Sequence, residues 1–500
     1  MRLTLTPRLM LVLTCLVVLL AGCTTSSASH RHGGASAGAR AVHAASGPNS
    51  SSRPNIVFVL TDDLASNLLP YMPNVERLAR RGTSFSNYYV VDSLCCPSRS
   101  AIFTGDYPHD TGVYTNHLPD GGMRAFDEHR DADRTFAVAL QRRGYQTGLL
   151  GKYLNGYQPT VPKPAGWSEW DVAGTGGYGE FNYTLNQDGV QTSYGNAPED
   201  YLTTVIGRRA GSLIHDARRP FMLELASFAP HIPATPAPRD ANAFPDVHAP
   251  RNPSYGRVSV NAPAWLRKLP PLAPQDNVHI DKAFRKRVQA VQEVDRVVGA
   301  LERQLQQQGL ADNTYFVFSS DNGYHMGEHR LLPGKQTAFD TDIRVPLIVA
   351  GPGVPHGRTV SAMASSIDLA PTFADLGGGR LRGDPDGVSL AKLWHGAAVP
   401  TDWQNSVLVE HHGPDYDRHD PDVQTVRYGN PPTYEALRTS TALYVEYQDG
   451  EREYYDTVKD PYETNNLAPT ASPVVLAGLH ARLRALTTCH GATACQVAAR

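Results

Sequence analysis

Acidic and amide side chains follow two short apolar segments of the chain. They are Asp62 and Asp63 after residues 55–60 (NIVFVL), and Asp321 and Asn322 after residues 315–319 (YFVFS). Apolar runs of this length are typical of strands buried on both faces of a sheet. In open α/β sheets, ligands bind at the carboxyl ends of the strands. Carboxylates gathered there repel one another unless a cation lies among them, so the pattern predicts a site for Ca²⁺ or Mg²⁺.

A simpler explanation exists for either pair alone, because aspartate and asparagine also cap helices and form turns. That explanation does not account for two such pairs at matching positions after two buried strands. We therefore favour the metal site.

Cys95 begins a segment that suits an anion. Pro97 is well placed in the first turn of a helix, which residues 100–104 can continue until Gly105. Backbone N–H groups at a helix start favour negative charge, and Arg99, one turn on, can face the same point. A free cysteine is more often a small buried residue, but the adjacent arginine and the predicted metal site favour a chemical role.

Three further polar residues belong to the same edge of the predicted sheet. Lys152 follows an apolar run at residues 147–150, His231 follows residues 226–230, and Lys335 comes after Gly334. A single lysine or histidine is usually a surface residue. Together, around an anion-binding helix start and a metal, they predict a site for an anionic ester.

The elements that must position these residues alternate in type. Strands are predicted at residues 55–60, 147–150, 221–225, 315–319 and 345–350, and helices at residues 75–81 and 284–308. The second helix has valines and leucines at helical spacing and ends at Gly309. This alternation predicts an α/β sandwich with a mainly parallel sheet in a catalytic domain of residues 53–400. The Pro-rich segment of residues 230–274 is expected to be irregular and to form one wall of a substrate pocket.

The last hundred residues have a different pattern. Short strands are predicted at residues 406–411, 433–438, 442–447 and 451–455, and a helix at residues 474–486. Asp449 and Gly450 form a hairpin signal between the last two strands. Residues 401–500 are therefore expected to form a small α+β subdomain with an antiparallel sheet.

The N-terminus carries an export signal. Arg2 and Arg8 flank the start of a short apolar run, and small residues lead to Cys23. The ending LAGC resembles the bacterial lipobox, so residues 1–23 are predicted to be a signal peptide with an acylated Cys23; a plain signal peptide is the alternative. Residues 24–52 predict a flexible tether. We expect an exported protein, either a lipoprotein on the outer face of the cell membrane or a secreted form.

Composition and cysteine usage agree with an exported globular protein. The 500 residues are 41% hydrophobic and 19% charged, with a net charge of −3, which gives no indication of nucleic-acid binding. Cys489 and Cys495 favour a small disulfide loop over two free thiols. Cys95 and Cys96, which are adjacent, need another explanation.

Residues 95–99 (CCPSR), followed by Thr104 and Gly105, resemble the signature of type I, formylglycine-dependent sulfatases. Residues 151–155 (GKYLN), 229–233 (APHIP) and 320–325 (SDNGYH) look like the branch that contains N-acetylglucosamine-6-sulfatases and extracellular heparan 6-O-endosulfatases. Residues 460–467 (DPYETNNL) are similar to the C-terminal sulfatase pattern. The resemblance covers most of the chain after residue 52 and implies an alkaline-phosphatase-like sandwich.

This resemblance implies that a formylglycine-generating enzyme oxidises Cys95 to an aldehyde, which hydrates to a gem-diol. One hydroxyl attacks sulfur and expels the alcohol. The second hydroxyl then loses its proton, the aldehyde re-forms and sulfate leaves. A serine at this position would form a stable sulfate ester and stall.

The resemblance also implies roles for the other residues. The cation, Ca²⁺ rather than Mg²⁺, would be held by Asp62, Asp63, Cys95, Asp321 and Asn322 and would acidify the gem-diol. Arg99 would support the hydrate, Lys152 and Lys335 would neutralise charge on the sulfate and leaving oxygen, and His231 would be the general acid. Many sulfatases have a histidine where this chain has Leu154, so the base is left open. Asn155 and His325 are candidate substrate contacts.

The expected substrate is a sulfated carbohydrate or an aryl sulfate. A phosphodiesterase or phosphonate monoester hydrolase of the same superfamily is the alternative. A non-catalytic lipoprotein that binds sulfated glycans is less favoured, because an inactive chain would be expected to lose Cys95, Arg99 or a metal ligand.

His231→Ala should lower turnover most for substrates with poor leaving groups. A general acid contributes about 10²–10⁴-fold when the leaving alkoxide needs a proton. Steady-state kinetics on a sugar sulfate and on an activated aryl sulfate would measure this difference. Equal losses on both substrates would show that His231 is not the acid.

Overall fold

The computed structural model describes residues 53–416 and 423–500. The described residues pack as one compact unit. The predicted signal peptide, Cys23 lipobox and tether lie outside the described residues. No helix in the described part of the chain is long and apolar enough to cross a membrane.

Within the described residues, ten strands form a large mixed sheet in the order β11-β2-β10-β9-β1-β8-β4-β5-β6-β7. The strands are β1 (Asn55–Thr61), β2 (Thr83–Phe85), β4 (Gln146–Lys152), β5 (Glu169–Ala173), β6 (Thr184–Gln187), β7 (Val190–Ser193), β8 (Phe221–Ala226), β9 (Thr314–Ser320), β10 (Leu347–Ala350) and β11 (Arg358–Val360). The five central strands, from β9 to β5, are mutually parallel. The predicted mainly parallel sheet is confirmed.

The register of the central strands explains how distant residues reach one edge. Leu60 of β1 lies opposite Ala226 of β8, and Thr61 lies opposite Ser320 of β9. Every residue of β1, β8 and β9 is buried, as continuous apolar runs in a doubly covered sheet require. The residues that follow these strands therefore emerge side by side.

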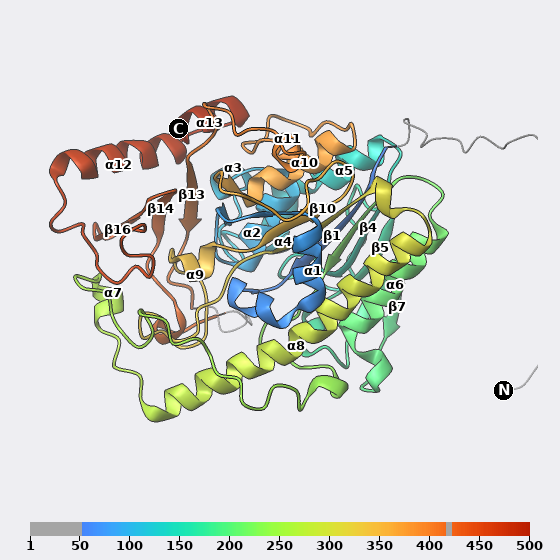
Figure 1. Ribbon diagram of the computed structural model, residues 1–500, viewed down its shortest axis with the longest axis horizontal. Coiled ribbons are helices and arrows are strands. Elements are labelled where there is room, and N and C mark those ends of the chain that lie inside the picture. The colour runs from blue at the N-terminus through green and yellow to red at the C-terminus, as the bar shows by residue number, and fades with distance from the viewer. Residues whose placement is uncertain (1–52, 417–422) are drawn as a thin grey trace, which may run out of the picture. The chain divides into compact units, whose positions relative to one another are not determined.

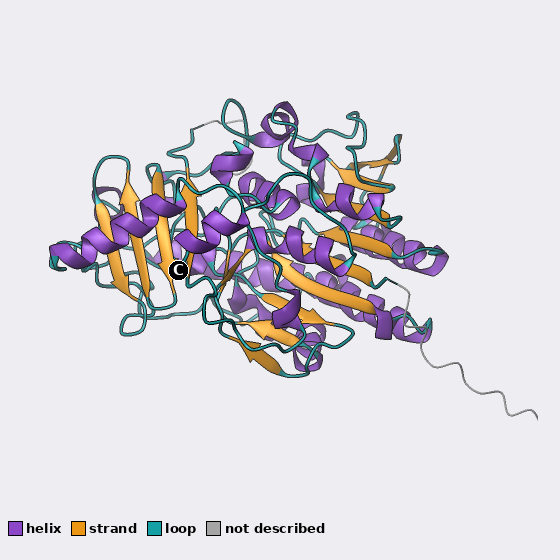
Figure 2. Cartoon of the chain, turned by 90° about the horizontal axis from the view of Figure 1, so that it is seen from above, coloured by secondary structure: helices purple, strands orange, loops and turns teal. Residues whose placement is uncertain are grey.

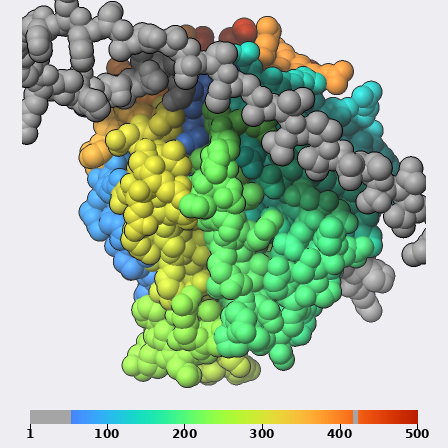
Figure 3. All heavy atoms as spheres, turned by 90° about the vertical axis from the view of Figure 1, so that its right-hand side faces the viewer, coloured from blue at the N-terminus to red at the C-terminus, as the bar shows by residue number. Residues whose placement is uncertain are grey.

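Helices cover both faces of this sheet (Figures 1 and 2). One face packs on α1 (Pro73–Arg81), α6 (Leu202–Asp216) and α8 (Pro274–Gln307), and Figure 3 shows the last two side by side. The other face packs on α2 (Cys95–Thr104), α5 (Phe136–Arg142) and α10 (Leu369–Leu376). The shorter helices are α3 (Pro108–Thr111), α4 (Gly122–Glu128), α7 (Ala264–Arg267), α9 (Asp340–Ile343) and α11 (Ala391–Trp394).

Helix α8 begins ten residues before the predicted start at residue 284. Its first turn contains Pro274, and Asp276 accepts a hydrogen bond from the backbone of Ala273, 2.8 Å away. Ile280 is the first buried residue of the helix. The apolar periodicity therefore marks only the part of α8 that packs on the sheet, whereas capping determines where the helix starts.

A second, four-stranded sheet in the order β13-β14-β15-β16 is antiparallel throughout. Its strands are β13 (Ser406–His411), β14 (Tyr434–Thr439), β15 (Ala442–Tyr447) and β16 (Arg452–Asp456), within one residue of prediction at each end. Helix α12 (Pro473–Leu486) packs against β14 and is followed by α13 (Ala492–Ala498). The boundary at residue 400 stays a prediction, since both sheets belong to one compact unit.

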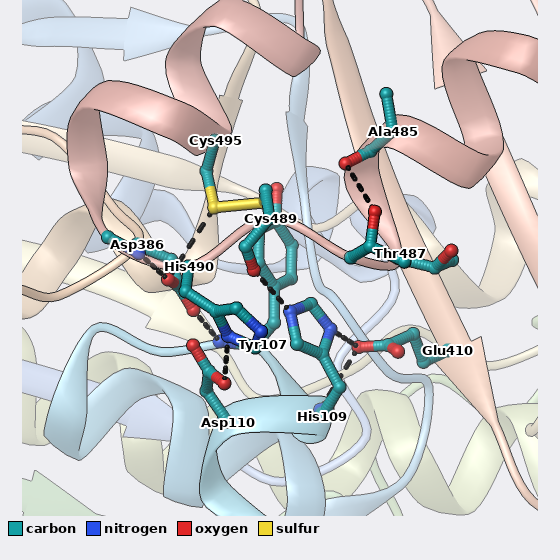
Figure 4. Close-up of a disulfide and its surroundings, with 12 residues drawn as sticks. Tyr107, His109, Asp110, Asp386, Glu410, Ala485, Thr487, Cys489, His490 and Cys495 are labelled. Carbon is teal, nitrogen blue, oxygen red and sulfur yellow. Dashed lines mark hydrogen bonds and ion pairs between the residues drawn. A yellow bond between two sulfur atoms is a disulfide. The ribbon is translucent and has the colours of Figure 1, made fainter.

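The favoured disulfide between Cys489 and Cys495 is present and closes the turn between α12 and α13 (Figure 4). His109 Nε2 lies 2.9 Å from the Cys489 carbonyl oxygen, and His490 Nδ1 lies 2.6 Å from Asp110 Oδ1. These contacts hold the C-terminal end of the chain against α3.

Two short parallel strands lie outside both sheets, β3 (Tyr88–Tyr89) and β12 (Ala364–Ser365). They were not predicted, nor were β2, β5, β6, β7 and β11 at the sides of the main sheet. Segments this short show no clear period of two. Residues 230–274 are irregular, as expected, except for α7 and one helical turn at Pro238–Asp240.

Leu301→Ala should lower the free energy of unfolding by about 2–5 kcal/mol, because Leu301 is buried in α8 against the sheet. Val278 lies on the same helix and is 69% exposed, so Val278→Ala should change it by about 0.5 kcal/mol or less. Equilibrium denaturation measures both. Equal effects would contradict the burial assigned to α8.

Candidate active site

Four of the five predicted metal-binding residues converge at the carboxyl edge of β1 and β9. Asp321 Oδ1 accepts a hydrogen bond from the backbone N–H of Asp63 at 3.1 Å, and Asn322 Nδ2 donates to Asp63 Oδ1 at 2.8 Å. Asp62, Asp63, Asp321 and Asn322 are all at most 1% exposed. Asp63 has φ of 66°, a left-handed conformation that aspartate tolerates better than most residues.

Cys95 lies at the start of α2 and faces this cluster. Its Sγ is within 3.4 Å of Asp62 Oδ1, and Lys335 Nζ lies 2.8 Å from the same sulfur. The helix ends at Gly105 with φ of 86°, as predicted. The thiol is thus buried between a carboxylate and an ammonium group at a helix N-terminus.

Arg99, one turn further along α2, is fully buried and orients Asp321. Its Nε donates to Asp321 Oδ2 at 2.7 Å, and its Nη1 donates to the carbonyl oxygen of Lys152 at 3.2 Å. Ser98 Oγ donates to the Asp321 carbonyl at 2.5 Å. Arg99 therefore joins the ends of β4 and β9 to α2.

Two lysines pair with the first two aspartates. Lys152 Nζ lies 2.5 Å from Asp62 Oδ2, and Lys335 Nζ lies 2.7 Å from Asp63 Oδ1. Burial alone would raise the pKa of Asp62, but Lys152 and the other nearby cations outweigh burial and hold this pKa well below its usual range. Asp62 is therefore ionised at neutral pH.

His231 completes the cluster from the start of the Pro-rich segment. Its Nδ1 lies 2.7 Å from the Ile232 carbonyl oxygen, which identifies Nδ1 as the donor, and its Nε2 lies 3.7 Å from Asp63 Oδ2. One donor atom each from Asp62, Asp63, Cys95 and His231 lies within 4.8 Å of the others. Together with Lys335, which contacts Asp63 across 272 positions of sequence, these residues are brought to one point by the fold.

A profile described as "Sulfatase" matches residues 54–379, well over half of the chain. The chain belongs to the sulfatase family. A second profile, described as "N-sulphoglucosamine sulphohydrolase, C-terminal", matches residues 327–488. The protein is a sulfatase, a sulfuric ester hydrolase, as the residues around Cys95 predicted.

Curated relatives of this sulfatase include N-acetylglucosamine-6-sulfatases. The protein of Homo sapiens is 34% identical over 476 residues, covering 88% of this chain and 86% of the relative. An extracellular sulfatase of Drosophila melanogaster is 34% identical over 374 residues, covering 72% of this chain and 33% of the relative.

Solved structures share the fold. One, a complex with "its substrate D-Glucosamine-2-N, 6-O-disulfate", has a TM-score of 0.73 at 24% identity and covers 87% of this chain and 97% of the other. A phosphonate monoester hydrolase of Agrobacterium radiobacter has a TM-score of 0.67 at 21% identity, covering 87% and 96% of the two chains. The alkaline-phosphatase-like fold of the sulfatase is thereby confirmed.

The two predicted substrate contacts differ in their surroundings. Asn155 lines a cavity of about 230 Å³ with Lys152, Leu154 and Tyr178, and its Nδ2 donates to the Tyr178 hydroxyl at 3.3 Å. Both ring nitrogens of His325 already have partners among its neighbours. Nδ1 lies 2.9 Å from an Asp342 oxygen, and Nε2 lies 3.0 Å from the Tyr428 carbonyl.

His325 acts on the site through its backbone. Its N–H donates to the Gly334 carbonyl at 2.8 Å, directly before Lys335. The backbone of His325 therefore anchors the segment that presents Lys335. Substrate contact by Asn155 and by His325 stays a prediction.

Tyr178 and Arg287 belong to the site but were not predicted. The Tyr178 ring lies 4.5 Å from the His231 ring, and no motif marks its segment. Arg287 is buried in α8 and donates to the carbonyls of Asp63 and Pro230. The sequence did contain a signal for the burial of Arg287. This residue lies three residues after Phe284 and four before Val291, and this spacing places it on the apolar face of its helix.

The donor set fits a divalent cation. Asp63 Oδ2 and Asn322 Oδ1 are buried oxygens that have no hydrogen-bond partner among residues 53–416 and 423–500. Leaving such an atom unsatisfied costs about 1–3 kcal/mol, more for a charged group. An oxygen-preferring cation beside Asp62, Asp63, Asp321 and Asn322 would satisfy both.

Stabilisation by Ca²⁺ should grow with pH. Burial and the charge of Asp62 raise the pKa of Asp321 from 3.8 to about 6 despite Arg99. A raised carboxyl pKa favours the fold below the unfolded pKa of 3.8, and this contribution is lost as pH rises through about 6. Cation binding needs the ionised carboxylate, so Ca²⁺ offsets this loss of stability above that pH. At a free Ca²⁺ concentration of about a hundred times Kd, binding would raise the free energy of unfolding by about 2.7 kcal/mol.

Thermal unfolding with Ca²⁺ or with a chelator, at about pH 5 and about pH 7.5, measures this effect. Asp63→Asn removes a ligand charge and should reduce the Ca²⁺-dependent shift. A shift of equal size at both pH values would contradict a carboxylate site that competes with protons.

Proposed function

We propose that this sulfatase removes 6-O-sulfate from a glucosamine-containing glycan, with Cys95 converted to formylglycine as its nucleophile. The observation that carries the proposal is the position of Cys95 Sγ, buried at a helix start between Asp62 and Lys335. A buried structural cysteine needs no ammonium group 2.8 Å away. A hydrated aldehyde at this point would lie next to the Lys335 ammonium group, which can bind the sulfate that the hydrate attacks.

The charges of the site favour an anionic substrate. Asp62, Asp63 and Asp321 contribute three negative charges, and Arg99, Lys152 and Lys335 contribute three positive charges, so these six groups sum to zero. A bound divalent cation, with Ca²⁺ preferred over Mg²⁺, would supply Lewis acidity and a net positive charge. This charge would stabilise the negative charge that develops on the sulfate oxygens.

Each residue then has one role. Asp62, Asp63, Asp321, Asn322 and the modified Cys95 side chain would hold the cation. Lys335 Nζ, beside Cys95, binds the sulfate group, and Lys152, at the wall of the cavity with Asn155, neutralises the oxygen that leaves. His231 donates a proton to the leaving alcohol through Nε2, since its Nδ1 is held by the Ile232 carbonyl. Leu154 supplies no proton acceptor, so another residue is the base.

Relatives named N-acetylglucosamine-6-sulfatase, at 34% identity over most of both chains, support the amino-sugar substrate. The predicted signal at residues 1–23 and relatives named as extracellular support export, as a lipoprotein or secreted protein. A formylglycine-generating enzyme would act on Cys95 during maturation. Phosphonate monoester hydrolases share the fold, so phosphonate and phosphate esters are the alternative substrates.

Mass spectrometry of the tryptic peptide Gly82–Arg99 tests the nucleophile. Protein from its natural host should carry an aldehyde in place of the Cys95 thiol. Cys96→Ala should keep this modification, whereas Cys95→Ala should lose it together with activity. Unmodified Cys95 in the natural host would overturn the mechanism.

Assays on N-acetylglucosamine 6-sulfate and on a phosphonate monoester would test the substrate. Release of sulfate with a higher kcat/KM than cleavage of the phosphonate is the expected result. The reverse order would replace the proposed activity by its alternative.

A further inference from the structure

A second cavity lies beside the catalytic cluster, between the first half of α8, two loops near the catalytic residues, and the segment of residues 423–428. It has a volume of about 500 Å³. One loop contributes Ile232 and Pro233, directly after His231, and the other contributes Pro333, two residues before Lys335. The cavity therefore begins within one or two residues of two catalytic side chains. None of the roles assigned above uses it.

The described lining of this cavity is positively charged. His279, Lys282 and Lys286 project from α8 with spacings of three and four residues, which places them on one face of the helix. The described lining residues include no aspartate or glutamate. The neighbouring cations Arg251 and Arg427, by contrast, are paired with Asp281 and Asp276. Within the described chain, Lys282 and Lys286 form no ion pair, so their charge is available to a ligand.

The inner wall of the cavity is rigidly connected to the catalytic cluster. The buried Arg287 guanidinium lies 4.0 Å from the centre of the Tyr324 ring, and both residues line the cavity. Arg287 Nη1 also donates to the Pro230 carbonyl at 3.1 Å, next to His231. A group bound against this wall would therefore lie at a defined position relative to the nucleophile.

The remaining lining suits a sugar ring. Ile232 is 47% exposed, and Pro233, Ala283 and Tyr428 add apolar surface. Carbohydrate sites commonly combine apolar walls with a few placed polar groups. An apolar wall with an unpaired cationic rim fits a charged saccharide better than a neutral one.

We propose that this cavity binds a second acidic group of the same glycan chain, a sulfate or a carboxylate on a sugar beyond the one that loses its sulfate. The preferred substrate is then an anionic oligosaccharide rather than a monosaccharide sulfate. This inference rests on the proposed sulfatase activity toward glycans and adds a specificity site to it.

The test compares two substrates with the same terminal 6-sulfated glucosamine, a monosaccharide and a tetrasaccharide that carries uronic acids and further sulfates. The wild-type enzyme should prefer the tetrasaccharide, and added salt should weaken that preference. We define the preference as kcat/KM for the tetrasaccharide divided by kcat/KM for the monosaccharide. Lys282→Glu combined with Lys286→Glu should lower this ratio by about tenfold, chiefly by raising KM for the tetrasaccharide.

The matched control is Arg382→Glu combined with Lys392→Glu, which makes the same charge change at two exposed positions away from the cavity. It should leave the ratio as in the wild type. Both variants change exposed side chains, and equal thermal unfolding temperatures would show that they are folded. Tetrasaccharides with reduced carboxyl groups, or without the additional sulfates, identify which acidic group is bound.

The outcomes separate the two proposals. A wild-type enzyme that releases sulfate from neither substrate overturns the proposed function itself. A wild-type enzyme that cleaves both without preference, or a double lysine variant whose ratio equals that of the control, overturns only the cavity as a binding site.

Discussion

The rest of the site depends on three buried ion pairs around Cys95. They join Asp62 to Lys152, Asp63 to Lys335 and Asp321 to Arg99, and each of these six side chains is at most 3% exposed. A buried charge without its partner destabilises a protein by about 3–5 kcal/mol. Because the partners come from β1, β4, β9, α2 and the segment after His325, the cluster is satisfied only when all of these elements are in place.

The register of the parallel sheet makes this pairing possible. Thr61 lies opposite Ser320 and Leu60 lies opposite Ala226, so Asp62, Asp321 and the His231 loop leave the sheet at one level. A shift by one residue would turn these side chains to the opposite faces. The hydrophobic burial of β1, β8 and β9 therefore also fixes the geometry of the charged groups that follow them.

Helix α8 serves the core, the site and the proposed binding cavity with different faces. Its apolar face covers the sheet, and the buried Arg287 holds the backbone of Asp63 and Pro230. Its first half presents Lys282 and Lys286 to the neighbouring cavity. The same helix thus relates the catalytic loop to a second point of contact for the substrate, which is how specificity can be built next to a common catalytic centre.

Much of this protein was determined by local sequence. The apolar runs predicted β1, β8 and β9, the residues after them predicted the acidic cluster, and residues 95–99 predicted helix α2 with Cys95 at its start. These features depend on residue type and short spacing, which a single sequence displays. Cys489 and Cys495 were likewise favoured as a pair, because only six positions separate them.

Other features were decided by tertiary structure. The short side strands of the sheet depend on neighbours supplied by distant segments. The early start of α8, by contrast, follows from a local cap at Pro274 and Asp276 that apolar periodicity does not reveal. Substrate contact by His325 stays a prediction, and the partners of its ring, Asp342 and Tyr428, come from separate elements that only the fold brings together. Tyr178 lies beside His231, and Lys282 lines the second cavity, only because the fold brings distant segments together. Local sequence determines which chemical groups are present, whereas long-range packing decides which of them share one environment.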